Sequence, residues 1–347
     1  MQETMKAIVK DKAAPGARLM EVPVPQVGPK DVLVEVKATS ICGTDLHIFN
    51  WDQWAQSRIK PPMVFGHEFS GIVLEVGDMV TDIKVGDHVS AETHITCGRC
   101  YQCRIGMRHY CQNCKIIGVD VPGTFAEYAV IPDKVAWVND KSIPFEIASI
   151  QEPMGNAIYA TTDGSPITGE TVAIFGCGPF GQMACAVAKQ AGAFKVIAIE
   201  PNEYRAQAAL KLGADSVINP DKEDLYSRIA ELTDRAEVDV VLEMSGHPKA
   251  IRDGFKLLRN GGRITLFGIP SQPITLDLPQ DIIFKSAHVI GITGRKIFET
   301  WFQVAAFLRS SKIDIRPVIT HQFKLEEFEE AMALMKEGRS GKIVMHP

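Results

Sequence analysis

A cysteine, a histidine and a distant Gly-His-Glu run form the first pattern in this sequence that could do chemistry. Cys42 and His47 lie in the segment T-S-I-C-G-T-D-L-H (39–47), and His67 and Glu68 follow in a separate segment. Ligands this far apart do not fit a zinc finger. A catalytic zinc takes its few ligands from separate segments and keeps one position open, and thiolate, imidazole and carboxylate all suit zinc. From these residues alone, a buried thiol and two unrelated histidines remain an equal alternative.

A second group of cysteines gives the sharpest local pattern in the chain, C-x2-C-x2-C-x7-C. Its members are Cys97, Cys100, Cys103 and Cys111, enough for a closed tetrahedral zinc site that has no open position and is therefore structural. Ferredoxins also use C-x2-C-x2-C, but their motif continues x3-C-P, whereas seven residues intervene here and no proline follows. The pattern therefore favours zinc over an iron–sulfur cluster, and Cys114 is expected to be a spare thiol.

A glycine-rich turn, G-C-G-P-F-G, joins a predicted strand at 171–175 to an alanine-rich helix expected over about 182–191. Gly176 allows the tight turn, Gly178 lets the backbone approach a pyrophosphate, and Gly181 permits close helix–strand packing. The N-terminus of the helix supplies donors to the phosphates. Because the glycines lie between a strand and a helix, they indicate a dinucleotide-binding site.

An acidic residue, Glu200, follows the next predicted strand at 195–199. A carboxylate at this position can accept hydrogen bonds from the adenosine ribose and would repel a 2′-phosphate, so it favours NAD over NADP. Arg205 lies one helical turn further on. It could bind a 2′-phosphate or stack near the adenine, and with Glu200 before it the second interpretation is preferred.

The elements that must position these residues differ between the two halves of the chain. In the first half, short strands at 6–10, 32–36, 71–76 and 88–90, separated by Gly-Asp and Pro-Pro turns, predict a twisted β-barrel or sandwich. Cys42 and His47 are expected on a short turn after the strand at 32–36. From about 157 to 297, strands alternate with helices, which predicts a doubly wound parallel sheet.

At 347 residues, the chain is long enough for two domains, each with its own core. A helix at 326–336 and a strand at 341–345 are expected to return to the first domain. The predicted boundaries are therefore 1–156 with 298–347 for the first domain and 157–297 for the second.

Composition excludes several other classes of protein. The formal net charge is −5 with both signs interspersed, and no basic run appears, so no nucleic-acid partner is expected. The N-terminus lacks the apolar core of a signal peptide. The longest apolar stretch, 171–188, is interrupted by glycines, Pro179 and Gln182, so no membrane span is expected. With metal-type cysteine spacing and no export signal, we expect a cytoplasmic protein.

Taken in this order, the two cysteine patterns and the dinucleotide fingerprint resemble the zinc-dependent medium-chain dehydrogenases, along the whole chain. The resemblance implies a GroES-like β-barrel followed by a Rossmann domain, with the active site in the cleft between them. The segments that carry the closest similarity are S-I-C-G-T-D-L-H (40–47), W-D-Q-W (51–54), T-H-I-T-C-G (93–98), P-M-G-N-A (153–157) and G-I-T-G-R (291–295).

The resemblance also assigns residues to functions. It implies that Cys42, His67 and Glu68 hold a catalytic zinc and that Thr44 and His47 relay a proton. Glu152 stands where the family has an acidic group at the metal, either a labile ligand or a base beside it. The implied NAD contacts are Gly176, Gly178, Phe180, Gly181, Glu200, Arg205, Phe267, Gly268, Ile269, Ile292 and Thr293.

The resemblance implies one catalytic and one structural zinc per chain, NAD+ as cofactor and a homotetramer. The expected reaction oxidises the 3-hydroxyl of L-threonine, a small-molecule substrate, to 2-amino-3-oxobutanoate. Two alternatives stay open at this point. One is a polyol or 2,3-butanediol dehydrogenase of the same fold, and the other is a dinucleotide-binding protein without a catalytic metal, against which the presence of Cys42, His67 and Glu68 argues.

Overall fold

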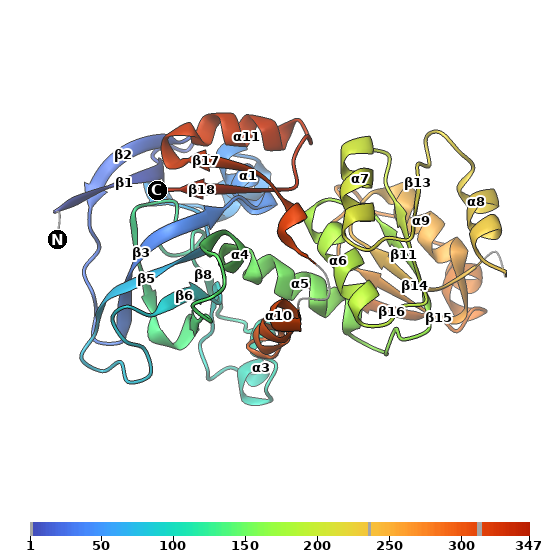
Figure 1. The fold of residues 1–347 in the computed structure, drawn as a ribbon, viewed down its shortest axis with the longest axis horizontal. Helices are drawn as coiled ribbons and strands as arrows, with labels where there is room; N and C mark the ends of the chain where they lie inside the picture. Colours follow the sequence, from blue (N-terminus) through green and yellow to red (C-terminus); the bar gives the residue numbers. More distant parts are fainter. Residues whose placement is uncertain (1–2, 235–236, 311–313) are drawn as a thin grey trace. The chain divides into compact units, whose positions relative to one another are not determined.

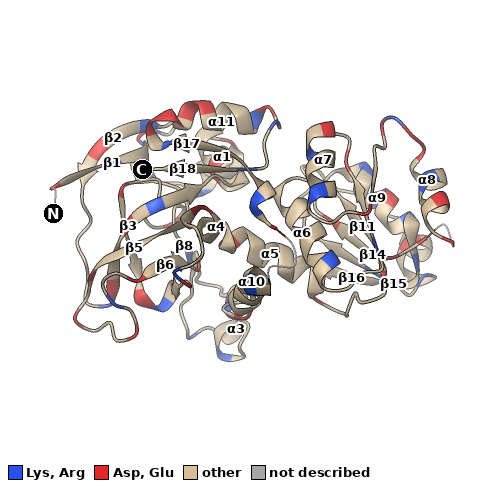
Figure 2. Cartoon of the chain, in the orientation of Figure 1, with Lys and Arg blue, Asp and Glu red and all other residues tan. Residues whose placement is uncertain are grey.

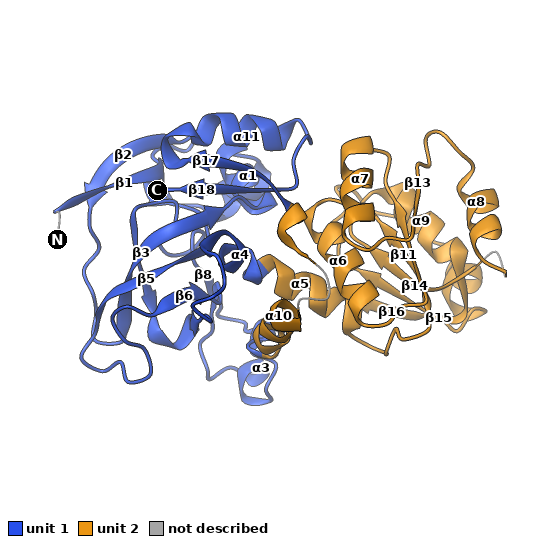
Figure 3. Ribbon diagram, in the orientation of Figure 1, with its two compact units in different colours: residues 1–152, 296–298, 319–347 blue, residues 153–295, 299–318 orange. Residues whose placement is uncertain are grey.

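The computed structural model describes residues 3–234, 237–310 and 314–347 (Figure 1). The chain divides into two compact units (Figure 3). Unit 1 comprises Met1–Glu152, Lys296–Phe298 and Ile319–Pro347, and unit 2 comprises Pro153–Arg295 and Glu299–Val318.

Unit 1 is built mainly from short strands, as the sequence predicts. Its strands are β1 (Thr4–Lys10), β2 (Arg18–Pro23), β3 (Asp31–Ser40), β4 (Met63–Val64), β5 (Glu68–Val76), β6 (His88–Ala91), β7 (His94–Ile95), β8 (Lys115–Ile116), β9 (Tyr128–Pro132), β10 (Ala136–Val138), β17 (Ile319–Lys324) and β18 (Lys342–His346). The largest sheet has the order β10-β6-β5-β3-β18-β17, with β9 also paired to β3, and smaller sheets are β2-β1-β4 and β7-β8. The C-terminal strand β18 therefore lies directly beside β3, which leads into Cys42.

The helices of unit 1 are short, and several are single turns. They are α1 (Gly43–Asn50), α2 (Gln53–Arg58), α3 (Tyr101–Arg104), η1 (Arg108–Tyr110), η2 (Asp133–Val135), α4 (Phe145–Ser149), η5 (Leu325–Glu327) and α11 (Phe328–Lys336), and α5 (Gln151–Thr162) begins at the end of this unit. The predicted turn after β3 is wrong, because residues 43–50 form a helix. The Asp45 carboxylate accepts a hydrogen bond from the Cys42 backbone N–H at 2.9 Å, and Ile48 is fully buried in the core, so a cap and tertiary packing together hold this helix.

Unit 2 contains a six-stranded sheet in which every neighbouring pair is parallel. Its strands are β11 (Thr171–Phe175), β12 (Lys195–Ile199), β13 (Ser216–Ile218), β14 (Val238–Glu243), β15 (Leu258–Leu266) and β16 (His288–Gly291). The order β13-β12-β11-β14-β15-β16 is the dinucleotide-binding order, in which the chain reverses direction across the sheet beside the first strand. The predicted doubly wound parallel sheet is confirmed.

Further helices belong to unit 2, and the first four along the chain share the core of its sheet. They are α6 (Pro179–Gln190), α7 (Glu203–Lys211), α8 (Leu225–Leu232), α9 (Pro248–Leu257), η3 (Leu278–Ile283), α10 (Glu299–Ser310) and η4 (Arg316–Val318). Every residue of β11 and β14 is buried, as expected for parallel strands covered on both faces. Helix α6 begins at Pro179 rather than at the predicted Gln182, because the fixed φ of proline suits the first helical position.

Both signs of charge occur on each unit, and acidic side chains gather at the start of α11 (Figure 2). Among the residues that the structure describes, none of the helices combines the length and the apolar character needed to cross a bilayer.

Candidate active site

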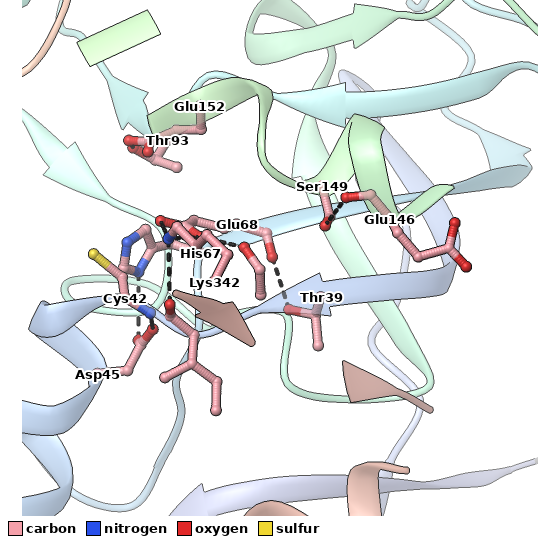
Figure 4. A network of polar contacts seen from close by, with 12 residues as sticks. Thr39, Cys42, Asp45, His67, Glu68, Thr93, Glu146, Ser149, Glu152 and Lys342 are labelled. Carbon is pink, nitrogen blue, oxygen red and sulfur yellow. Dashed lines mark hydrogen bonds and ion pairs between the residues drawn. The ribbon is translucent and has the colours of Figure 1, made fainter. Parts of the chain in front are cut away.

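Three of the predicted metal ligands come together in unit 1. One ligand atom each from Cys42, His67 and Glu68 lies within 4.8 Å of the other two, and both His67 and Glu68 are buried. Cys42 immediately precedes α1, and Glu68 begins β5. Figure 4 shows the three side chains converging from these separate segments. Thiolate, imidazole and carboxylate form a donor set that zinc accepts, with fewer ligands than a closed site requires.

Asp45 orients the histidine of this group. Its carboxylate, fully buried on α1, lies 3.4 Å from His67 Nδ1. Burial, the largest single influence, lowers the pKa of His67, but the charges and hydrogen bonds of Asp45 and Cys42 together outweigh it, so the pKa is raised well above its ordinary value. A carboxylate on one ring nitrogen leaves Nε2 to face a metal, the usual arrangement around a zinc-bound histidine. The sequence placed Asp45 in the motif but gave it no function.

Glu68 is held by two partners that are far apart along the chain, Ser40 and Lys342. Ser40 Oγ donates to Glu68 Oε2, and the buried Lys342 donates from Nζ to both carboxylate oxygens. Burial raises the pKa of Glu68, and the charge of Lys342 opposes that rise. Burial, the largest single influence, lowers the pKa of Lys342, but the charge and hydrogen bond of Glu68 and the charges of Cys42 and Glu152 together outweigh it, so this pKa is raised. We therefore regard the two groups as a buried ion pair.

Glu152 lies outside the three-ligand group. It is buried at the start of α5, and Thr93 Oγ1 donates to its Oε1 at 3.3 Å. After burial and Lys342, the charge of Glu152 is the next largest influence on the pKa of Glu68, which it raises. The structure thus places Glu152 within electrostatic reach of the candidate ligands without joining it to them (Figure 4).

The two predicted relay residues lie one helical turn apart on α1, so Thr44 and His47 share a face of the helix. The His47 side chain is 59% exposed, and its Nδ1 lies 2.5 Å from Asp52 Oδ2. Asp52 in turn caps α2, because its Oδ1 accepts from the Ala55 backbone N–H at 3.0 Å. This carboxylate fixes the ring of His47 while leaving it open to solvent. No function was predicted for Asp52, although it follows His47 by only five residues.

The four cysteines of the second pattern also come together, in a lobe around α3 and η1. Their sulfur atoms lie within 4.8 Å of one another; Cys111 lies 3.5 Å from Cys97 and 3.9 Å from Cys100. Neighbouring sulfurs of a tetrahedral zinc site with bonds of about 2.3 Å lie about 3.8 Å apart. Backbone hydrogen bonds from Arg99 and Cys100 lower the pKa of Cys97 to about 6, which favours the thiolate. Cys114 is not a member of the group, in agreement with the prediction.

The glycine turn of unit 2 has the shape that a dinucleotide needs. Gly176 has φ +86°, and a side chain there would meet Ser245 at 2.7 Å; a Cβ at Gly181 would lie 1.9 Å from the Gly176 carbonyl oxygen. Only glycine fits either position. Nothing lies within 4 Å of the corresponding point at Gly178, the N-cap of α6. Open space at a helix N-terminus suits a pyrophosphate.

Glu200 lies at the carboxyl end of β12, 4% exposed. Its Oε2 accepts from the Cys177 backbone N–H at 2.6 Å and its Oε1 from the Asn202 N–H at 2.9 Å. The carboxylate therefore ties the glycine turn to the next loop, and its remaining lone pairs are free to accept from ribose hydroxyls. Arg205, on α7, is half-buried and its charge reaches Cys177.

The other predicted cofactor residues gather at the same edge of the sheet. The rings of Phe180 and Phe267 lie 5.0 Å apart at 57°, and Ile292 belongs to the same apolar cluster as Phe267. Ile269 is 92% exposed, and Thr293 is also exposed. Exposed apolar side chains beside a backbone turn are available to contact a ligand.

A buried glutamate that the sequence did not single out shapes this edge. Glu243, the last residue of β14, accepts from the backbone N–H groups of Ser245 at 3.0 Å and Gly246 at 3.1 Å. A Cβ at Gly268 would lie 2.0 Å from Gly246 N, so the turn after β15 packs directly on the turn that Glu243 holds. The apolar run Val240–Leu242 at the end of a predicted strand, followed directly by a glutamate, is the signal that could have found it.

Comparison with known proteins assigns the chain to a family. Its residues 28–140 match the family model for the alcohol dehydrogenase GroES-like domain, and residues 179–310 match that for the zinc-binding dehydrogenases. The chain belongs to the zinc-binding dehydrogenases, which confirms the predicted medium-chain dehydrogenase family and the pairing of a GroES-like with a Rossmann domain.

Particular relatives extend over the full chain. The L-threonine 3-dehydrogenase of Symbiobacterium thermophilum is 53% identical, over 100% of this chain and 99% of its own, and that of Bacillus velezensis is 52% identical, over 99% of both. A solved zinc-binding dehydrogenase from Sinorhizobium meliloti, bound to NADP, is 29% identical with a TM-score of 0.92 over 100% of both chains. The 2R,3R-butanediol dehydrogenase of Bacillus subtilis is 28% identical with a TM-score of 0.89 over 99% of both.

Proposed function

We propose that this enzyme oxidises the 3-hydroxyl of L-threonine to 2-amino-3-oxobutanoate, with NAD+ as the hydride acceptor. The observation that carries the proposal is the convergence of Cys42, His67 and Glu68 in a chain that is 51–53% identical, over its full length, to L-threonine 3-dehydrogenases. The oxidation removes a hydride from C3 and a proton from the hydroxyl, so the site needs an acceptor for each.

Cys42, His67 and Glu68 would hold the catalytic metal, with Asp45 orienting His67. A zinc ion bound there would supply a Lewis acid that lowers the pKa of the substrate hydroxyl. The four cysteines of the lobe would hold the second, structural zinc.

Thr44 and His47 carry the proton in this proposal. The hydroxyl of Thr44 can both accept and donate a hydrogen bond, and an imidazole exchanges protons near neutral pH. His47 is held by Asp52 and is 59% exposed, so a proton that reaches it can pass to water. The substrate loses its hydroxyl proton along this path while the C–O bond becomes a carbonyl.

The cofactor would bind to unit 2. The open N-terminus of α6 at Gly178 would receive the pyrophosphate, Glu200 the adenosine ribose, and Phe267-Gly268-Ile269 with Ile292-Thr293 the nicotinamide half. Glu200 favours NAD+, since a 2′-phosphate would meet its buried negative charge. The relative from Sinorhizobium meliloti has the same fold and is bound to NADP. The fold alone therefore does not determine the choice of cofactor, and the two affinities have to be measured.

Glu152 is the residue through which the site would favour an amino alcohol over a polyol. It adds a buried carboxylate beside Glu68, and the ammonium of threonine is a cation that can balance it, whereas a diol carries none. The likeness to a butanediol dehydrogenase keeps a neutral diol as the second candidate substrate.

Glu152→Gln tests this assignment, because the change keeps the side-chain volume and removes the charge. The expected result is a much larger fall in kcat/KM for threonine than for 2,3-butanediol, measured as NADH formation. Parallel losses on the two substrates would assign Glu152 to the metal shell instead of to the ammonium.

Two broader properties belong to the same proposal. All eight cysteines are free thiols, which supports a cytoplasmic location. Association with further copies of the chain, as in the proposed homotetramer, is supported by β16, which ends the sheet order of unit 2, and by the nearby exposed apolar side chains of Ile283, Phe284 and Val289, because a sheet edge and exposed apolar side chains are surfaces that another chain can cover. Light scattering on the purified protein measures the subunit number.

A further inference from the structure

A lysine from the C-terminal strand lies inside the candidate metal site. Lys342 is the first residue of β18 and only 1% exposed. Two features hold its strand there: β18 pairs antiparallel with β3 through Val344 and Ser40, and the Ile41 backbone N–H donates to the Ile343 carbonyl oxygen at 3.0 Å. The backbone that leads into Cys42 is thus bonded to the backbone that carries Lys342.

The ammonium group of Lys342 is directed at one metal ligand. It donates to Oε1 and to Oε2 of Glu68 and to the Ile41 carbonyl oxygen at 3.2 Å. Figure 4 shows Lys342 lying against Glu68 beside His67 and Cys42. Glu68 is fully buried, so water does not screen this pair as it would an exposed one.

We propose that Lys342 is a positioning residue of the catalytic metal site, which competes with zinc for the carboxylate of Glu68 and so limits how strongly that carboxylate binds the metal. A carboxylate that accepts from an ammonium on both oxygens has less electron density to give to a second cation. Zinc and the ammonium also repel each other across the shared group.

Removing the ammonium should therefore strengthen zinc binding for two reasons. Zinc would no longer be repelled by a neighbouring positive charge. In the metal-free protein, moreover, Glu68 would be a buried carboxylate without its cation, a costly state that zinc relieves. This direction is unusual, because most groups around metal ligands support the metal, and losing them weakens binding by about 10–100-fold.

The test is zinc affinity in the full-length enzyme, which rests on the proposed catalytic zinc at Cys42, His67 and Glu68. Lys342→Met removes the charge and the donors, Lys342→Gln removes the charge but keeps N–H donors, and Lys342→Arg keeps the charge as the matched control. Zinc affinity is measured by competition against a chromophoric chelator, with the four-cysteine lobe still loaded. The Met and Gln variants should bind the catalytic zinc at least about tenfold more tightly than the wild type. The Arg variant should match the wild type.

Cobalt substitution provides a spectroscopic signal that would not change on mutation of Lys342 if the ion pair were purely structural. With Co²⁺ in the catalytic site, the visible d–d bands should shift in the Met and Gln variants, since Glu68 would bind the metal more strongly, and should stay unchanged in the Arg variant. If Lys342→Met does not fold, Lys342→Gln, which keeps a hydrogen-bond donor for Glu68, carries the comparison.

Unaltered zinc affinity and cobalt bands in the neutral variants would overturn the inference and leave Lys342 as a core ion pair. Weaker zinc binding would overturn it as well, because Lys342 would then be supporting Glu68 as a ligand. A wild-type enzyme that binds no metal beyond the four-cysteine lobe would instead contradict the proposed catalytic site.

Discussion

The pairing of His47 with Asp52 is the clearest functional detail at the scale of single residues. A carboxylate on Nδ1 fixes the tautomer and orientation of an imidazole, so that the other nitrogen exchanges protons with a defined partner. The His47 ring is also exposed, as the last protein group of a proton path must be. The arrangement predicts that His47 acts in catalysis and not in metal or cofactor binding.

His47→Asn should lower kcat by about 10²–10⁴-fold, the usual contribution of a positioned acid–base group. It should also change the pH dependence of kcat, while the zinc content and the NAD+ affinity stay close to those of the wild type. Steady-state rates across a pH series measure both effects. A variant with a lower rate but the same pH profile would remove His47 from the relay.

Glu200 gives a second prediction at this scale, for cofactor choice. Glu200→Ala should weaken NAD+ binding more than NADP+ binding, because charge-assisted hydrogen bonds to the ribose, worth about 1.5–3 kcal/mol, are lost only for NAD+. The variant also loses the bonds to the Cys177 and Asn202 backbones, so the ratio of the two affinities is the quantity to compare. Glu203→Ala, an exposed neighbour on α7, is the control, and equal losses for both cofactors would exclude the assignment.

At the scale of elements, the four-cysteine lobe depends on its metal. Its helical parts, α3 and η1, have four and three residues, too few to be stable as isolated helices. Tyr101, Ile105 and Met107 are exposed, so the lobe buries little apolar surface of its own. Bonds from four thiolates to one zinc would replace the missing core.

Cys100→Ser should therefore lower the thermal unfolding midpoint and reduce the zinc content by about one equivalent per chain. Cys114→Ser removes a neighbouring thiol outside the group and should change neither quantity. Calorimetry and metal analysis on the two variants make the comparison. Full stability of the Cys100 variant after loss of one zinc would contradict the structural function of the lobe.

Elements also show where sequence reasoning succeeds and where it fails. The four-cysteine lobe and the glycine turn were predictable because their residues are close in sequence. In each of them a single chemical requirement, a thiolate ligand or a residue without a side chain, explains the residue type. Helix α1 was missed because Gly43, Thr44 and Asp45 have weak helix propensity, and its cap and its buried Ile48 become visible only in three dimensions.

For the whole molecule, contacts between residues that are far apart along the chain are what the sequence alone does not predict. Glu68 and Lys342 are 274 residues apart and still form one buried pair. The sequence identified the strand that carries Lys342 and expected it to return to the first domain, but no local signal places one particular lysine against one particular glutamate. Asp45 was missed for a different reason, since it lies inside a motif whose Cys42, Thr44 and His47 already had functions, and Asp52 was missed because the segment 51–54 carried only similarity.

Initial rates of NADH formation decide whether this chain is a zinc-dependent, NAD-dependent enzyme for L-threonine. The purified, zinc-loaded enzyme is assayed with L-threonine, 2,3-butanediol and sorbitol under identical conditions, with metal analysis on the same sample. We predict the highest kcat/KM for L-threonine at about two zinc per chain. A higher kcat/KM for the diol or for sorbitol, or no NADH formation from threonine by the fully loaded enzyme, would exclude L-threonine as the substrate.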